Sequence, residues 1–363
     1  MLVNTAQLTP GYVLRKNVYA KAETPLIRAG TVLNQVHLEF LNAFLIRQVD
    51  AEPGSAGRQS VLKEENLAED TEDMEEKAES GVKEVHLLDE AYQRAVQTYR
   101  LFFRQWQSGE AVNIGEFRKA VMPLLAGFLD EPVFLVHQLI RRTVVRSRPD
   151  RSVSLGLLSA FMGKKMNFSQ GDIYQIGLAG MLCDCGMAKL PPSLLNREDP
   201  ENGGGRRLYE SHVTNSYKML KSVPTLKENA MLAVIQHHER EDGSGFPLHL
   251  TGERLSLSGK ILAVCDSFLQ WTAQFSEKDC LPQTLDALRE ASYGKLSGYL
   301  LDKLSRELMG LFIGVKVVLT DGKEGEITFI PEKEPTRPLI RLTNNQVIAL
   351  SRKNQLKIDR MTH

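Results

Sequence analysis

The feature that most constrains this chain is the stretch of residues 233–268, which gathers metal-ligand side chains around a glycine- and proline-rich turn. Two adjacent histidines, His237 and His238, follow an apolar run, and the turn GSGFP occupies residues 243–247. A second apolar run with helical character ends at Asp266. Imidazole and carboxylate ligands suit iron, manganese or zinc, and backbone rich in glycine and proline can come close to a phosphate. The stretch therefore indicates a functional site.

Composition indicates a soluble globular protein of more than one domain. The chain has 363 residues, of which 42% are hydrophobic and 25% are charged, and this is enough to bury a large core. Lysines and arginines number 45 and acids number 45, so the formal net charge is zero. The composition therefore does not indicate non-specific binding to a nucleic-acid polymer. The four cysteines lack a C-x-x-C spacing, and we expect free thiols.

The sequence contains no apolar run of membrane-spanning length, and its first residues lack the basic start and apolar stretch of a secretory signal. We therefore expect a cytoplasmic protein without a membrane partner. Apolar periodicity predicts a mainly α-helical chain with small β-rich segments at its two ends, α+β overall. The predicted segments are a small β-rich domain over 1–50, an acidic flexible linker over 51–83 whose last part joins the next helix, helices over 84–143, a helical core over 144–310 and a β subdomain over 311–363.

The string HHEREDGSGFP resembles the loop HHE-x-x-DGSGYP of the HD-GYP family, with Phe246 in the tyrosine position. The string ILAVCD, which ends at Asp266, resembles the family's ILAVAD-like helix. HD-GYP proteins are bacterial phosphodiesterases that hydrolyse the second messenger cyclic di-GMP. The resemblance covers the core firmly and its flanks loosely, and it implies the helical HD metal-hydrolase bundle. It also implies a nucleotide-contacting loop with the candidates Asp242, Gly243, Gly245, Phe246 and Pro247.

The same resemblance implies two metal sites that share one aspartate, and this chain departs from the family pattern at only one of them. The positions implied for the first site are Arg151, Cys183, Asp184 and Asp266, so that two expected histidines are replaced. The positions implied for the second site are Asp184, His212, His237 and His238. A lysine that lies near the phosphates in the family is Met187 here. We therefore expect at most one divalent ion, either iron, manganese or zinc.

Each replacement has chemical content. A guanidinium has no lone pair for a metal, so Arg151 either pairs with Asp184 or Asp266 where the first metal would lie, or is a surface residue of its helix. Cys183 is either a buried thiol, which we favour, or a thiolate ligand. The thioether of Met187 cannot neutralise a phosphodiester.

Two functions remain open from the sequence. The first is a non-catalytic or weakly active regulator that binds cyclic di-GMP or a related guanine nucleotide, or holds a protein partner such as a diguanylate cyclase. The second is an active, metal-dependent cyclic di-GMP phosphodiesterase with an altered site, in which Cys183 or water replaces the missing ligands. We favour the first, because a two-metal clamp needs the ligands that are replaced, and we assign no catalytic residue. We expect the C-terminal β subdomain to be a contact surface either for the N-terminal β unit or for a second subunit in a homodimer.

Overall fold

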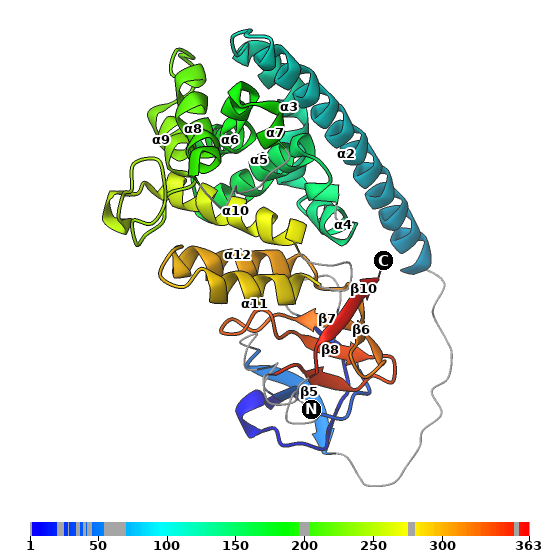
Figure 1. Ribbon diagram of the computed structural model, residues 1–363. Helices are drawn as coiled ribbons and strands as arrows, with labels where there is room; N and C mark the ends of the chain where they lie inside the picture. Colours follow the sequence, from blue (N-terminus) through cyan, green and yellow to red (C-terminus); the bar gives the residue numbers. More distant parts are fainter. Residues whose placement is uncertain are drawn as a thin grey trace. The chain divides into compact units, whose positions relative to one another are not determined.

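The computed structural model describes residues 2–19, 25–27, 29–33, 37–38, 41, 46–53, 70–141, 143–195, 203–274, 280–351 and 356–362. The chain divides into two compact units, Met1–Glu75 and Glu76–His363. Figure 1 shows a mainly helical molecule with small sheets, as the sequence predicted.

The first unit is β-rich. Its elements are β1 (Leu2–Asn4), η1 (Thr5–Gln7), β2 (Tyr12–Leu14), β3 (Val18–Tyr19), β4 (Pro25–Ile27) and β5 (Gln48–Pro53). Strands β1, β5 and β2 form an antiparallel sheet with β5 in the middle, and β3 pairs with β4. Leu14, Leu33 and Ala51 are buried inside this unit. The predicted β-rich N-terminal segment is therefore present, and its last strand runs to Pro53.

The long helix α2 (Asp70–Gln107) begins inside the stretch that the sequence predicted as a linker. Acidic residues at its start suit the positive end of the helix dipole, and glutamate, alanine and lysine favour helix. Residues 54–69 lie outside the described part of the chain, so the linker prediction there stays a prediction. The buried face of α2 carries an aromatic cluster in which Tyr99 and Trp106 meet edge to face, with ring centroids 5.6 Å apart.

The rest of the helical core follows in short elements. They are α3 (Ile114–Asp130), α4 (Phe134–Ile140), η2 (Thr143–Val145), α5 (Arg148–Lys165), α6 (Gln170–Leu182), η3 (Cys185–Lys189), α7 (Pro192–Leu195), α8 (Gly203–Leu220), α9 (Glu228–Gln236), η4 (Gly252–Arg254), α10 (Leu257–Gln274), α11 (Leu281–Ala291) and α12 (Gly298–Gly310). Among the described helices none is by itself long and apolar enough to cross a membrane, and only α3 and α4 together, bent by 101°, reach that length and composition.

Helices α5 and α6 form the centre of this core. A Cβ on Gly180 would lie 2.9 Å from the Cα of Gly156, so glycine at this crossing lets the two backbones approach closely. Helix α5 is buried around its whole circumference from Ser152 to Gly163, which is the burial expected of a central helix. The hydroxyl of Tyr92 on α2 donates to the carbonyl of Asp150 over 3.2 Å and fastens α2 to the start of α5.

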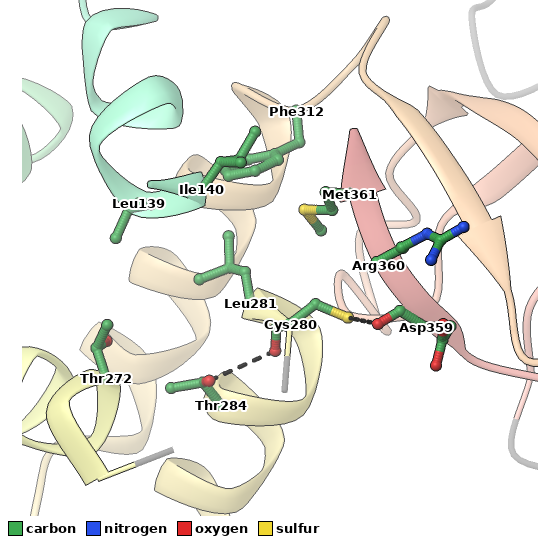
Figure 2. A pocket seen from close by; sticks show the side chains of 10 residues that line it. All are labelled: Leu139, Ile140, Thr272, Cys280, Leu281, Thr284, Phe312, Asp359, Arg360 and Met361. Carbon is green, nitrogen blue, oxygen red and sulfur yellow. Dashed lines mark hydrogen bonds between the residues drawn. The ribbon is translucent and has the colours of Figure 1, made fainter. Parts of the chain in front are cut away.

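The chain ends in a five-stranded antiparallel sheet with the order β10-β6-β7-β8-β9. Its strands are β6 (Lys316–Leu319), β7 (Glu324–Phe329), β8 (Leu339–Leu342), β9 (Val347–Ala349) and β10 (Ile358–Thr362). The turn at Asp321 and Gly322 joins β6 to β7, as the alternation predicted, and Gly322 has a φ of 81°. The thiol of Cys280 donates to the carbonyl of Ile358 over 2.9 Å and ties β10 to the helical core. A cavity of about 110 Å³ lies beside this contact. Figure 2 shows that its lining mixes apolar side chains such as Leu281 and Phe312 with polar ones such as Thr284 and Asp359.

Candidate metal centre

Four ligand-type residues from distant parts of the sequence meet in the core. Asp184 lies between α6 and η3, His212 lies in α8, and His237 and His238 follow directly after α9. One ligand atom of each lies within 4.8 Å of those of the other three, and all four residues are buried. The structure thus brings together the complete set that the sequence implied for the second metal site.

The orientation of two histidines fits a metal ion. The Nδ1 atoms of His212 and His237 lie 2.5 Å and 2.7 Å from the carbonyl oxygens of Tyr209 and Val234. Because a carbonyl only accepts, each Nδ1 carries a proton, and the Nε2 of a neutral ring is then the atom that can offer a lone pair to a metal. The two Nε2 atoms lie 3.3 Å and 3.5 Å from Oδ1 of Asp184 and have no other hydrogen-bond partner among the described residues. Lone pairs that face a carboxylate in a buried site are best satisfied by a cation between them.

The protonation states at the centre also suit a metal. Without a metal ion, burial by itself would raise the pKa of Asp184, but hydrogen bonds from the Nε2–H groups of His212 and His237 and the charge of Arg151 hold that pKa well below its usual range. Burial, together with the neighbouring His237 and His212, moves the pKa of His238 well below its usual value. A carboxylate and a neutral imidazole are the forms that bind metal ions.

Arg151 connects the two aspartates beside this cluster. In the first turn of α5, its Nη1 lies 3.0 Å from Oδ2 of Asp184, and its Nη2 lies 2.6 Å from Oδ1 of Asp266. Its side chain is 19% exposed, so the alternative of a free surface residue is wrong and the predicted pairing is present with both partners. Burial would lower the pKa of Arg151, but Asp266 and Asp184 raise it, and the cation is permanent. The guanidinium thus joins the two carboxylates that the sequence implied for the first metal site.

The remaining replacements are buried and uncharged. The thiol of Cys183 is inaccessible to solvent and donates to the carbonyl of Gly180 over 3.4 Å. Burial first, and then the negative charges of Asp184 and Asp266, raise the pKa of Cys183 well above its usual value. Cys183 is therefore a protonated thiol, which fits the interpretation we favoured. Met187 in η3 is 1% exposed and behaves as a core side chain.

The glycine-rich loop packs against the cluster through Phe246, whose ring stacks on His238 at a centroid distance of 4.7 Å. Asp242 accepts hydrogen bonds from the backbone and hydroxyl of Ser244 and so stabilises the loop itself. A Cβ on Gly245 would lie 2.3 Å from the backbone nitrogen of Arg240, so only glycine fits there. Gly243 has a φ of 77°, and the peptide between Phe246 and Pro247 is cis.

The buried carboxylate of Glu239 holds this loop in place. It accepts from the backbone nitrogens of Leu248 and Leu250 over 2.6 Å and 2.9 Å. We had not predicted this role, although the position of an acid directly after two histidines was a usable signal. Glu239 is a positioning residue, because it fixes the loop that carries Phe246 onto His238.

A cavity of about 480 Å³ opens beside Arg151 and Asp184. The described residues around it are Arg100, Phe103, Arg104, Gln107, Val145, Arg146, Ser147, Arg148, Pro149, Arg151, Asp184, Leu195, Tyr209 and Gln270. The residues that we predicted for the nucleotide loop do not belong to this lining. Arg151 was predicted as a site residue, but Arg100, Arg104, Arg146 and Arg148 were not. The only sequence signal for Arg100 and Arg104 was the helical spacing of residues 100, 103, 104 and 107 on one face of α2.

Residues 135–293 match the family model described as HD domain, and this stretch contains Asp184, His212, His237 and His238. The chain is 29% identical over 170 residues to a cyclic di-GMP phosphodiesterase of Pseudomonas aeruginosa, a match that covers 46% of this chain and 40% of the relative. It is 30% identical over 169 residues to a cyclic di-GMP phosphodiesterase of Thermotoga maritima, covering 46% and 44%. These matches are consistent with the resemblance to the HD-GYP family that the loop of residues 237–247 indicated.

The matched region spans less than half the length of these relatives. A further relative, a 3'3'-cGAMP-specific phosphodiesterase of Vibrio cholerae, is 27% identical over 193 residues, which is 52% of this chain and 37% of that protein. Among solved structures, an HDG"Y"P protein from Bdellovibrio bacteriovorus aligns with a TM-score of 0.48 and 12% identity over 85% of this chain and 99% of that chain.

Proposed function

We propose that this protein is a regulatory HD-GYP protein that holds one divalent ion, binds a guanine nucleotide and does not hydrolyse cyclic di-GMP at enzyme rates. The observation that carries the proposal is the guanidinium of Arg151 between Asp184 and Asp266, at 3.0 Å and 2.6 Å. A cation there satisfies the carboxylates that a second ion would need.

The single ion would be held by Asp184, His212, His237 and His238, since their donor atoms converge. Apart from their contacts with Asp184, the two Nε2 atoms of His212 and His237 have no hydrogen-bond partner among the described residues. When bound, such an ion supplies positive charge to a phosphate oxygen. The chain's own residues set the rest of the site. The backbone carbonyls of Tyr209 and Val234 orient two imidazoles, and Phe246 covers the third.

Loss of hydrolysis follows from what a second ion contributes. Two ions clamp a phosphodiester and stabilise both the attacking and the leaving oxygen. Arg151 adds charge but has no lone-pair chemistry, so it cannot activate a water molecule. Met187 stands where the family resemblance implies a lysine, so a second positive charge near the phosphate is also missing. The protein then retains the means to bind a phosphate but lacks the means to break its ester bond.

The relatives support the ligand class, because their names give cyclic di-GMP and 3'3'-cGAMP as substrates. The loop of Asp242, Gly243, Gly245, Phe246 and Pro247 remains our prediction for nucleotide contact. A protein partner such as a diguanylate cyclase, and a homodimer, remain predictions as well.

A second candidate function, an active phosphodiesterase with an altered site, is favoured by the intact cluster around Asp184. In that case the single ion and Arg151 together would neutralise the phosphate. Cys183 does not support this alternative as a ligand, because its thiol donates to the carbonyl of Gly180 and does not belong to the cluster of converging donor atoms.

A turnover assay separates the two functions. The full-length protein, reconstituted separately with Fe(II), Mn(II) and Zn(II), is incubated with cyclic di-GMP, and the products are quantified by chromatography. We expect no turnover above that of a His212→Ala/His237→Ala control, together with measurable nucleotide binding. Turnover near about 1 s⁻¹ or faster, the usual range of enzymes, would contradict the proposal and establish the second function.

A further inference from the structure

We infer that the arginine-lined cavity beside Arg151 binds a nucleoside polyphosphate, with the phosphates on the arginines and the base against Phe103 and Tyr209. This inference rests on the proposed function, because it names the ligand class of the same regulatory site. A nucleoside polyphosphate differs from a cyclic dinucleotide because it carries a chain of phosphates with a free end, and this chain is the group that the arginines would recognise.

Charge is the first argument. Five arginines line the cavity, and Asp184 is the only acid among the described lining residues. Arg151 is already paired with Asp184 and Asp266. The other four arginines bring four positive charges to a lining that contains no further acid among its described residues. Of these four, Arg146 has only a loose contact of 3.8 Å with Asp150. A terminal phosphate brings about 1.5 to 2 negative charges in addition to those of the inner phosphates, whereas each diester of a cyclic dinucleotide carries a single charge.

Geometry is the second argument. Arg100 and Arg104 are one helical turn apart on α2 and point to the same side as Phe103. Arg100 donates a hydrogen bond to the side chain of Gln97 over 3.3 Å, and Arg148 donates to the carbonyl of Leu195. Both partners are uncharged, so these contacts leave the positive charge of each guanidinium uncompensated. Guanidinium groups bind phosphate oxygens in pairs of hydrogen bonds, and several of them together favour a ligand with several phosphates.

The size and aromatic residues of the cavity fit a nucleotide. Its volume of about 480 Å³ lies within the usual range for small-molecule sites. Phe103 and Tyr209 face it from α2 and α8, and neither ring is fully buried. Flat aromatic rings provide stacking surfaces for a base. A bare polyphosphate would use the arginines but not these rings.

The position of α2 is the third argument. Arg100 and Arg104 precede the HD domain match, which begins at residue 135. Two of the four arginines without a close acidic partner therefore come from α2, outside the matched domain. The hydroxyl of Tyr92 and the carbonyl of Trp106 fasten this helix to Asp150 and Lys189 of the core, at 3.2 Å and 2.7 Å. The arginines are therefore held over the cavity by packing rather than by an acidic partner.

Calorimetric titration of the full-length protein tests the inference. The probes are GTP, GMP, cyclic di-GMP and inorganic tripolyphosphate, all at the same ionic strength, because phosphate binding depends on salt. We expect GTP to bind at least about tenfold more tightly than GMP, cyclic di-GMP and tripolyphosphate. The double variant Arg100→Gln/Arg104→Gln should weaken GTP binding by about ten- to a hundredfold.

Arg94→Gln is the matched control, because Arg94 lies on the same helix in an exposed pair with Glu90 at 3.3 Å. It should leave GTP affinity within about twofold. Equal affinity for GTP and cyclic di-GMP, or equal losses in Arg94→Gln and in the double variant, would overturn the inference. Tripolyphosphate binding as tight as that of GTP would overturn the assignment of a nucleoside. Hydrolysis of cyclic di-GMP bears only on the proposed function, so the two failures are distinguishable.

Discussion

The guanidinium of Arg151 donates a hydrogen bond to the carboxylate of Asp266 over 2.6 Å and joins positions that are 115 residues apart in the chain. Its other arm reaches Asp184 at 3.0 Å. One arginine therefore pairs with two buried carboxylates and compensates part of their charge. Several consequences of this pairing can be measured.

Removing this cation should destabilise the fold. Arg151→Met keeps the length of the side chain but leaves Asp184 and Asp266 without their cation. We expect the free energy of unfolding in EDTA to fall by about 3–5 kcal/mol, the cost of breaking a buried ion pair, as measured by urea denaturation. Arg94→Met, which removes an exposed pair with Glu90, should cost less than about 1 kcal/mol. Equal stability of Arg151→Met and the wild type would show that the pairing is unimportant for the fold.

Metal content should respond to two substitutions. We expect one equivalent of transition metal per chain in the wild type and none in His212→Ala/His237→Ala, as measured by elemental analysis. Arg151→His/Cys183→His supplies two imidazoles beside Asp184 and Asp266 and should raise the content toward two equivalents. Two equivalents in the wild type would contradict the single-ion proposal.

Stability without metal should decrease on mild acidification. The pKa of His238 is lowered in the folded protein, chiefly by burial and by the neighbouring His237 and His212, so the unfolded chain takes up a proton near pH 6.5 while the folded chain does not. The unfolded state then binds more protons, and stability falls as the pH drops below about 6.5, at a limiting slope of about 1.4 kcal/mol per pH unit.

Urea denaturation in EDTA between pH 7.5 and 5.5 measures this slope, and His238→Gln should reduce it. The pKa of Asp184 is lowered despite burial, through His212, His237 and Arg151, so its contribution is present above its unfolded value and disappears only at more acidic pH. An unchanged slope in His238→Gln would refute the assignment to His238.

Thiol reactivity should distinguish the cysteines. Cys183, Cys185 and Cys265 are buried, whereas Cys280 is partly exposed. Burial raises the pKa of Cys185 to about 12 and that of Cys183 well above its usual value. Brief treatment of the native protein with iodoacetamide should therefore label Cys280 first, and the other three only after unfolding, as read by peptide mass spectrometry. Early labelling of Cys183 would indicate a reactive thiolate at the centre.

The loop that covers His238 should tolerate no side chain at Gly245. An added Cβ would lie 2.3 Å from the backbone nitrogen of Arg240, and we expect Gly245→Ala to lower the free energy of unfolding by about 1–3 kcal/mol and to weaken metal binding. Gly204→Ala is the control, because its Cβ meets nothing within 4 Å, and it should change stability by less than about 1 kcal/mol. Similar losses in both variants would argue against a close-packed loop.

Much of the fold was predictable because it depends on patterns between residues that are close in the sequence. Helical periodicity and the alternation around Asp321 and Gly322 indicated a helical core followed by a sheet, and both are present. The start of α2 at Asp70 was harder to place, since an acidic stretch suits both a solvated linker and a helix N-terminus. Only packing of the later part of the helix, at Tyr92 and Trp106, distinguishes the two.

The sequence by itself determined the chemistry available at the centre: three imidazoles and two carboxylates remain, and a guanidinium and a thiol replace two histidines. Residue identity decides which groups can donate a lone pair and which carry a fixed charge. Only the tertiary structure decided that one guanidinium reaches both Asp184 and Asp266 and that Arg100 and Arg104 line the same cavity as Arg148. These relationships join residues from separate helices, and distances between such residues are set by how the helices pack, which no local pattern encodes.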